Sequence, residues 1–550
     1  MESNLKDSLP VVQGQSVGAS VYGHSAGYPD IQSRGQHQPK RCNDVFWAIL
    51  FYLQIAGMIC CAAIFLPQLE LDFEQAQDGY NGYYNDDKNG EENNNAYYGD
   101  DNQNAADDGY YYNRKMMEIV NGGNVMHSLM KVSTRSLFHV AKITGMVSDP
   151  SDERMLQEEN PNALFLLIGL TTVGAFFISI ASLGFMIKYA EGLIKTSLFF
   201  NMALGLVASV AGFASGSTEA GIMGLIFFLM GACYAWMVWS RIPFAAINLV
   251  TASSAIKANI GVTVFAYGAI VMNGLWLVLW SAATYSTLFV LGDCDAEGNC
   301  NNEISGLYVF LFVLSLYWTA QVIKNVVHTT VAGTVGTWWW TPIEAQGCCS
   351  KAVRDSHNRA MTSSFGSICL GSLLVAIIQT LKSFMESARE SDDGALKCIA
   401  DCLLGCLEQL MELFNEWAFV YVGLYGYSFV DAAKNVVTLF KQRGWTAIIT
   451  DYIVDRVLVM ISIGNGIIVG GVAALLSYSL ALNLAGVAFG VGFVVGVILS
   501  MVVLGVVSSG VNTIIVCYAE DPASFEINHY ELSVRMRETW RSAHPQEFKY

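Results

Sequence analysis

Long apolar runs recur along almost the entire chain, and no other feature of the sequence constrains the fold as strongly. Each run is long enough to cross a bilayer, which takes about 20 residues of helix. Lipid offers no hydrogen-bond partners to backbone groups, so every crossing segment must be helical. The sequence therefore predicts an all-α polytopic membrane protein with about ten transmembrane helices and a long outer loop after the first. The predicted spans are residues 44–66, 163–187, 196–213, 220–240, 259–290, 305–335, 363–386, 414–440, 453–479 and 486–518.

The span predicted at 414–440 differs from the others because it contains both an acid and a base near its middle. Asp431 and Lys434 lie within it, and charged side chains are expensive to bury in hydrocarbon. Two placements therefore stay open for this segment: a full crossing, or a position in the membrane interface.

Polar segments divide the chain into five regions. Residues 1–43 predict a disordered cytosolic N-terminal tail, and residues 44–66 predict the first transmembrane helix. Residues 67–162 predict an acidic outer loop rich in Tyr and Asn, which precedes a nine-helix membrane transport core at 163–518. Residues 519–550 predict a cytosolic C-terminal tail.

Composition agrees with a membrane protein and excludes several other classes. Hydrophobic residues make up 53% of the chain and charged residues 14%, whereas about a quarter of the residues of a soluble domain are charged. This apolar excess rules out a disordered, collagen-like, nucleic-acid-binding or small disulfide-stapled protein. The net charge of −17 is concentrated between Glu70 and Tyr112, where twelve acids and one base give −11. A segment this acidic should stay largely solvated.

The distribution of bases predicts the orientation of the helices. With ten spans and a cytosolic N-terminus, nine Lys and Arg residues fall in the short inner loops and two in the short outer loops. Cytoplasmic loops of membrane proteins carry the excess of bases, so both termini are predicted to be cytosolic, with the plasma membrane as the default location. The inner-loop bases are Lys188, Lys195, Arg241, Lys257, Lys351, Arg354, Arg359, Lys441 and Arg443, and the outer-loop bases are Arg389 and Lys397.

Cys294 and Cys300 lie in the predicted outer loop between spans five and six. Two interpretations stay open for them: a disulfide, which an oxidising compartment permits, or two free thiols. The chain has neither an HExxH nor a GxxxxGK[ST] motif, which are signatures of zinc proteases and of P-loop nucleotide-binding proteins. We therefore predict no enzymatic activity, no metal site and no cofactor.

Polar side chains inside the predicted spans are the candidates for function, because burying them in lipid is expensive. In span six, Tyr317, Gln321, Lys324 and His328 follow the spacing of a single helical face. Such a face should point at a cavity or at another polar helix. Two interpretations stay open: the face lines a cavity, or its polar groups tie neighbouring helices together.

Several long strings carry a family resemblance. They are YWTAQVIKNVVHTTVAGTVGTWWW (317–340), SSFGSICLGSLLVAIIQTLK (363–382), CLLGCLEQLMELFNEWAFVYVGLYGYSFVDAAKNVVTLFKQRG (402–444) and VVSSGVNTIIVCYAEDP (506–522). The start of span one, RCNDVFWAILF (41–51), fits the same pattern. In these strings the chain resembles the choline transporter-like family of solute carriers, and most of all its fungal and plant "pH nine sensitive" branch.

The resemblance implies a ten-span carrier of choline or a related organic cation, with proton exchange as a proposed form of coupling. A choline site needs aromatic rings around the methylated nitrogen and a polar contact for the hydroxyl group, and a carboxylate can complete it. From their span positions, the candidate substrate-binding residues are Gln54, Asn273, Trp276, Tyr317, Trp318, Gln321 and Asn325, and the candidate proton-coupling acids are Glu386 and Asp431.

The predicted partners are therefore a small organic cation and the lipid bilayer, with no nucleic acid, and the oligomeric state stays open. Two other functions also stay open. One is a carrier for a different small solute on the same fold. The other is a membrane scaffold or lipid-interacting protein without transport, in which the acidic loop recruits partners.

Overall fold

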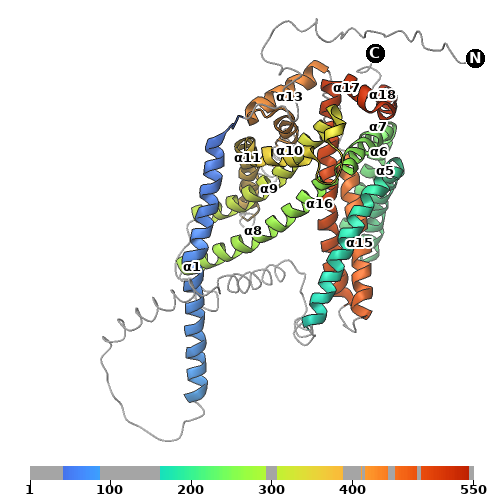
Figure 1. Cartoon of the computed structure of the whole chain (residues 1–550). Helices are drawn as coiled ribbons and strands as arrows, with labels where there is room; N and C mark the ends of the chain where they lie inside the picture. The colour runs from blue at the N-terminus through green and yellow to red at the C-terminus, as the bar shows by residue number, and fades with distance from the viewer. Residues whose placement is uncertain are drawn as a thin grey trace, which may run out of the picture.

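The computed structural model of the chain is a bundle of packed helices (Figure 1). Every regular element in the described part of the chain is a helix, which confirms the prediction of an all-α polytopic membrane protein. Cys294, Cys300 and the predicted N-terminal tail up to residue 40 lie outside the described residues. The described residues are 41–86, 161–292, 306–387, 415–443, 453–479 and 485–543, together with the single positions 405 and 411.

The long helices coincide with most of the predicted spans. Eight stretches of the described helices are long and apolar enough to cross a membrane, so the count of ten stays a prediction. The helices are α1 (Val45–Asp86), α5 (Pro161–Ala214), α6 (Thr218–Val238), α7 (Ile242–Ala258), α8 (Gly261–Gly292), α9 (Gly306–Trp340), α10 (Lys351–Met361), α11 (Phe365–Ser387), α13 (Phe429–Arg443), α15 (Ile453–Ser479), α16 (Ala485–Glu520), α17 (Pro522–Asn528) and α18 (Tyr530–Ala543), with the 3-10 turns η3 (Trp239–Arg241) and η4 (Pro342–Glu344).

Two predicted spans, 163–187 and 196–213, are two helical segments that meet directly at a kink within α5. α5 runs through both and bends at Tyr189, whose φ of −125° and ψ of 25° are not helical. The predicted inner loop between the spans is therefore helical, and Lys195 makes an ion pair of 2.7 Å with Glu191 one turn earlier. This linker contains no Pro and includes an i,i+4 pair that favours helix, so the chain returns to helix directly after Tyr189.

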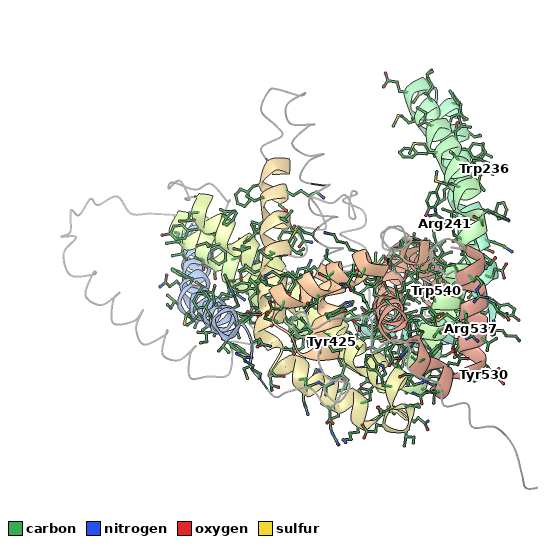
Figure 2. All side chains as sticks on the ribbon, turned by 90° about the horizontal axis from the view of Figure 1, so that it is seen from above. Trp236, Arg241, Tyr425, Tyr530, Arg537 and Trp540 are labelled. Carbon is green, nitrogen blue, oxygen red and sulfur yellow. The ribbon has the colours of Figure 1, made fainter. Side chains whose placement is uncertain are left out.

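The second half of α5 and α6 form an arm that extends away from the bundle (Figure 2). Glycines let the two helices approach closely, because Gly224 faces the backbone of Ser209 and Gly212 faces the backbone of Gly221. The Ser209 hydroxyl also donates to the Gly221 carbonyl at 2.9 Å. The outer surface of the arm is apolar, and Trp236 on it is 81% exposed, as suits a hairpin surrounded by lipid.

The segment predicted as a span at 414–440 is broken into two helices. Residues 415–425 form a helix whose apolar side chains are buried in the core. A turn at Gly426, which has a φ of 68°, separates this helix from α13. Because α13 is amphipathic, it lies across the end of the bundle (Figure 1), and its Asp431 is exposed.

Two residues just before α1 bind the start of this helix to the end of the bundle where α13 lies. The Asp44 carboxylate accepts the backbone N–H of Phe429 at 3.0 Å and the hydroxyl of Ser367 at 2.7 Å. The Asn43 side-chain amide donates to the Gly426 carbonyl at 2.7 Å. Asp44 therefore caps the N-terminus of α13 and brings the starts of α1, α11 and α13 together.

Two segments predicted to lie outside the membrane core are folded against it. α7 occupies the predicted inner loop between spans four and five, and its Leu249 and Ala252 are fully buried. α17 and α18 occupy the predicted tail 519–550, and α18 buries Met536 and Trp540 completely. α7 escapes a search for long apolar runs because it has only 17 residues, and α18 because only one of its faces is buried.

α1 continues beyond the predicted end of the first span. The apolar part, Val45–Gln68, matches the prediction, but the helix passes through Pro67 and ends at Asp86. The predicted outer loop 67–162 therefore begins as helix. Loss of apolar character marks where a span leaves lipid, and it does not by itself end a helix.

One end of the bundle gathers the elements that carry the predicted inner-loop bases. α10, α13, α17 and α18 lie there together with the start of α1 (Figure 1). We call this the basic end, because α10 contributes Lys351, Arg354 and Arg359 and α13 contributes Lys441. α15 ends and α16 begins at the opposite end of the bundle (Figure 1). Four of the nine bases that counting assigned to the inner side therefore lie at one end of the bundle.

Candidate functional site

α9 carries polar side chains on two adjoining sides. One side faces α1 and α11, and its hydrogen bonds join neutral groups. The adjoining side faces the helix 415–425, α15 and α16, and it brings ionisable groups together. Most residues predicted to bind substrate lie on the first side, which we call the neutral side.

On the neutral side, Gln54 ties α1 to α9. Its amide nitrogen donates to the Thr319 hydroxyl at 2.8 Å, and its amide oxygen accepts from the Ser315 hydroxyl at 2.6 Å. The indole N–H of Trp318 donates to the backbone carbonyl of Cys369 on α11 at 3.0 Å. Both ends of the Gln54 amide therefore have partners inside the protein.

Three more side chains of α9 make hydrogen bonds with α11. Each bond pairs two neutral side chains, so the contact satisfies polar groups that lipid could not. The pairs are Tyr317 with Ser383 at 2.9 Å, Gln321 with Gln379 at 3.1 Å, and Asn325 with Ser372 at 2.9 Å.

The aromatic residues predicted to cage a cation lie in different apolar clusters. Trp318 packs edge-on against Phe51, with ring centroids 5.4 Å apart. Trp276 packs instead in a second cluster with Met58 and Phe312. These rings therefore do not come together as one cage in the described structure.

The adjoining side of α9 meets a group of charged and polar residues that we call the charged centre. Four helices supply its members, and all four are otherwise strongly apolar where they meet. The charged centre comprises Lys324 and His328 of α9, Glu416 of the helix 415–425, Asp455 of α15, and Ser508, Ser509 and Asn512 of α16.

His328 joins three of these helices. Its Nδ1 lies 2.6 Å from the Ser509 hydroxyl, and its Nε2 lies 2.9 Å from the Glu416 backbone carbonyl. A carbonyl can only accept, so the geometry favours a proton on Nε2 and a hydrogen bond from Ser509 to Nδ1 in the neutral ring. The Asn512 amide donates to the Glu416 carboxylate at 3.2 Å.

Asp455 and Lys324 form the more open part of the charged centre. The Ser508 hydroxyl donates to the Asp455 carboxylate at 2.5 Å. Lys324 lies close enough for its charge to act on both Asp455 and His328. Lys324 is exposed and Asp455 is half-buried. An ammonium group is expensive in hydrocarbon, so Lys324 must either meet water or extend its long side chain toward the membrane interface.

Sequence analysis predicted Lys324 and His328 on a polar face but missed the acids that meet them. Glu416 and Asp455 lie inside the predicted spans 414–440 and 453–479, so their position within apolar runs was a usable signal. Within the described residues, no group of three or more His, Cys, Asp or Glu side chains is arranged to hold a metal ion.

The acids chosen from the sequence lie elsewhere. Asp431 is exposed in the first turn of α13 and accepts from the Ser428 hydroxyl at 2.7 Å, and α13 is not among the described helices that are long and apolar enough to cross a membrane. The side chain of Glu386, in the last turn of α11, lies outside the described part of the structure. Asn273 is half-buried on α8.

Comparison with known proteins identifies the family. The sequence profile of a family described as plasma-membrane choline transporter matches residues 222–523. Protein PNS1 of Debaryomyces hansenii is 31% identical over 394 residues, which cover 67% of this chain and 75% of that protein. The chain belongs to the choline transporter-like family.

Two further relatives of the choline transporter-like chain match over shorter regions. A CTL-like protein of Dictyostelium discoideum is 31% identical over 363 residues, which cover 65% of this chain and 63% of that protein. Protein PNS1 of Gibberella zeae is 35% identical over 339 residues, which cover 57% of this chain and 61% of that protein. These two matches span less than two thirds of the relatives' own length.

The family assignment makes this choline transporter-like chain a multi-pass membrane transporter for a small solute. The matched region runs from within α6 to the start of α17. It therefore contains every member of the charged centre but leaves out α1 and the acidic loop.

Proposed function

We propose that this protein is a carrier that moves choline or a related organic cation across the plasma membrane. The observation that supports this most is the charged centre, where Asp455 is bonded to Ser508 and Glu416 to Asn512, one turn apart on α16, among apolar helices. Ionisable residues inside membrane helices are expensive and typically mark solute or proton pathways. Carboxylates in such a place supply the negative charge that a cation needs when it leaves water.

A quaternary ammonium group has no N–H to donate, so a protein recognises it by charge and by the faces of aromatic rings. The helix 415–425 supplies both features. Glu416 provides the carboxylate, and the ring of Phe419 lies 6.4 Å from that of His328. The Phe419 side chain is completely buried, so we expect the substrate nitrogen to bind at the acids and to reach this ring only when the surrounding helices move apart.

We propose that Lys324 balances the negative charge of the site when no substrate is bound. Its ammonium group lies near Asp455 and offsets that negative charge while the site is empty. An organic cation then competes with Lys324 for the carboxylate. In this proposal a coupled proton binds to Glu416 or Asp455. Asp431 is not assigned this role, because it is exposed on α13.

The neutral side of α9 has a different role in this proposal. Gln54, Trp318, Gln321 and Asn325 already have hydrogen-bond partners within the protein. We propose that they hold α9 in position beside the substrate, and that the contacts to substrate come from the charged centre.

The basic end is proposed to face the cytosol, together with both termini. Bases concentrate in cytoplasmic loops of membrane proteins, and α10 and α13 carry bases at this end. A membrane-impermeant thiol reagent tests this orientation through Cys348 and Cys349, which are exposed between η4 and α10. The reagent should label them in inside-out vesicles and not in intact cells.

Uptake of labelled choline into proteoliposomes containing the full chain tests the function. We expect saturable uptake that excess ethanolamine reduces, measured with and without a pH gradient. Asp455→Asn should raise the choline concentration that gives half-maximal uptake at least about tenfold, whereas Glu538→Gln, a change of an exposed acid on α18, should leave it unchanged. Uptake that does not saturate would indicate a channel, and uptake of another solute alone would replace choline as the substrate.

The acidic segment supports a second candidate, a scaffold that recruits partners through its −11 charge. Deletion of residues 72–112 separates the two functions. A carrier should keep its maximal flux after the deletion, because the charged centre lies in other helices. A scaffold should show no saturable flux in the intact chain and should lose its cellular role with the loop.

A further inference from the structure

The C-terminal helices complete the hydrogen bonding at one end of α9. The last four carbonyls of an α-helix have no partner within the helix, and here all four are satisfied. The Thr337 carbonyl accepts from the Thr341 N–H at 2.7 Å. The remaining three are satisfied from the C-terminal segment: Trp338 by His529 at 3.0 Å, Trp339 by Asn528 at 2.9 Å, and Trp340 by Asn528 at 3.0 Å.

Aromatic stacking reinforces these bonds. The Trp339 ring stacks on Phe525 with centroids 4.0 Å apart and planes at 8°. The Trp338 ring stacks on His529 at 3.8 Å. In the other direction, the Trp339 indole N–H donates to the Asp521 carbonyl at 3.0 Å. The tryptophan run at the end of α9 is therefore a docking site for the C-terminal helices.

α18 extends the contact to a third helix. Trp540 is fully buried, and its indole N–H donates to the Asn248 side chain on α7 at 2.9 Å. Figure 2 shows Trp540 toward the bundle and Tyr530 at its outer margin. Tyr530 and the neighbouring Ile527 are 65% and 83% exposed, so only one face of the segment is docked.

The position of this segment links it to the charged centre. α16, which carries Ser508, Ser509 and Asn512, runs directly into α17 through Asp521. α9, which carries Lys324 and His328, is held by the bonds described above. Residues 521–543 therefore join the ends of two helices that supply most of the charged centre. We call these residues the clamp.

We infer that the clamp holds α9 and α16 together at the basic end and must loosen for that end of the bundle to open during transport. The inference rests on the proposed carrier function, because only a carrier needs to open its two ends in turn. A carrier cannot separate α9 from α16 at this end without breaking the bonds from Asn528 and His529 to the end of α9.

Hydrogen exchange of the full chain in detergent or nanodiscs tests the clamp without any substrate. The double variant Asn528→Ala/His529→Ala removes the capping side chains and leaves the buried core intact. We expect exchange to rise about tenfold in the last turns of α9 and α16 and also near residues 324–328 and 508–512. The matched control is Arg535→Ala on the exposed face of α18, which should leave exchange unchanged there.

A second, milder variant tests the clamp in case the double variant does not fold. Trp540→Phe keeps an aromatic ring in its buried site and removes the bond to Asn248 together with part of the packed ring, so we expect a smaller rise in the same peptides. A rise confined to residues 522–543 in both variants would overturn the inference, because the segment would then be a passive tail.

Choline transport provides a readout that simple destabilisation does not change. When the basic end of the bundle opens more easily, the apparent KM for choline supplied on the side of the basic end should fall about threefold. The apparent KM for choline supplied on the opposite side should rise. Loss of folded protein alone would lower maximal flux and leave both KM values unchanged. Unchanged KM values in a clamp variant with altered exchange would also refute the inference.

The two proposals can fail separately. If the intact chain transports no choline, the proposed function fails, and the exchange experiment still decides whether the clamp acts on the charged centre. If choline is transported and the clamp variants behave like the intact chain, only the clamp fails.

Discussion

On the neutral side of α9, polar contacts join uncharged groups in closed pairs, such as Gln54 with Thr319 and Asn325 with Ser372. On the adjoining side, the contacts involve ionisable groups, and Lys324 is exposed while Asp455 is half-buried. The same helix thus carries two kinds of polar surface. They differ in charge, in whether their polar groups are all paired within the protein, and in the number of helices that they join.

This difference indicates which side has a function beyond packing. A neutral hydrogen bond is a sufficient reason for a polar residue in a helix interface, because it contributes about 1 kcal/mol and leaves nothing unsatisfied. A carboxylate among apolar helices has no such justification, since replacing buried ion pairs by apolar residues is often neutral or stabilising. Carboxylates among apolar helices, such as Glu416 and Asp455, are best explained by a solute or proton that binds to them.

Neutralising the acids of the charged centre should have the largest effect. We expect Asp455→Asn or Glu416→Gln to lower choline affinity at least about tenfold, because a hydrogen bond or contact with a charged group contributes about 1.5–3 kcal/mol. Concentration dependence of uptake, normalised to folded protein, measures the change. Normal transport by both variants would remove the distinction between the two sides.

Trp318→Ala should have a large effect on stability and a small one on transport. Trp318 is 4% exposed and packs on Phe51, so its truncation should cost about 3–5 kcal/mol. Thermal unfolding in detergent measures this loss, and flux per folded molecule should stay near normal. The control Trp236→Ala changes a residue that is 81% exposed and should alter stability by less than about 0.5 kcal/mol.

The neutral hydrogen bonds should each contribute modestly. Gln321→Ala or Asn325→Ala removes one partner of a pair between α9 and α11 and should cost about 1–3 kcal/mol of stability. The choline concentration that gives half-maximal uptake should not change. A clear shift in that concentration would bring the neutral side into the binding site and weaken the comparison.

The clamp should respond to pH through His529, with the smallest effect of the four. Burial lowers the pKa of His529 below its ordinary value of 6.5, while the bond to the Trp338 carbonyl acts in the opposite direction. The undocked clamp therefore binds a proton more tightly than the docked clamp. Docking should be strongest above pH 6.5 and should weaken as the pH falls through the lowered pKa.

Hydrogen exchange of residues 522–543 at several pH values, corrected for intrinsic rates, measures this dependence. His529→Gln keeps a side-chain donor that does not titrate, so its docking should no longer change with pH. If the Gln variant keeps the full dependence, another pair is responsible, and Glu526 with Arg537 at 3.0 Å is the one to change next.

The sequence alone predicted most of the helices, because a bilayer demands long apolar helices and that demand is visible in every span. It also put Tyr317, Gln321, Lys324 and His328 on one face of α9, since helical spacing is a local property. Counting bases also assigned the bases of α10 and α13 to the same side of the membrane, and these two helices lie at one end of the bundle. The helix α7 and the docked clamp were missed, because a short buried helix and an amphipathic one leave no long apolar run.

Only the tertiary structure decided which partners those residues meet. It divided the predicted face, giving Tyr317 and Gln321 to α11 and Lys324 and His328 to the charged centre. Glu416 and Asp455 became candidates only when helices distant in the sequence were brought against α9, while Asp431 was exposed at a cap. The physical reason is that spacing along a helix sets the direction of a side chain, whereas its chemical environment depends on the helix packed against it.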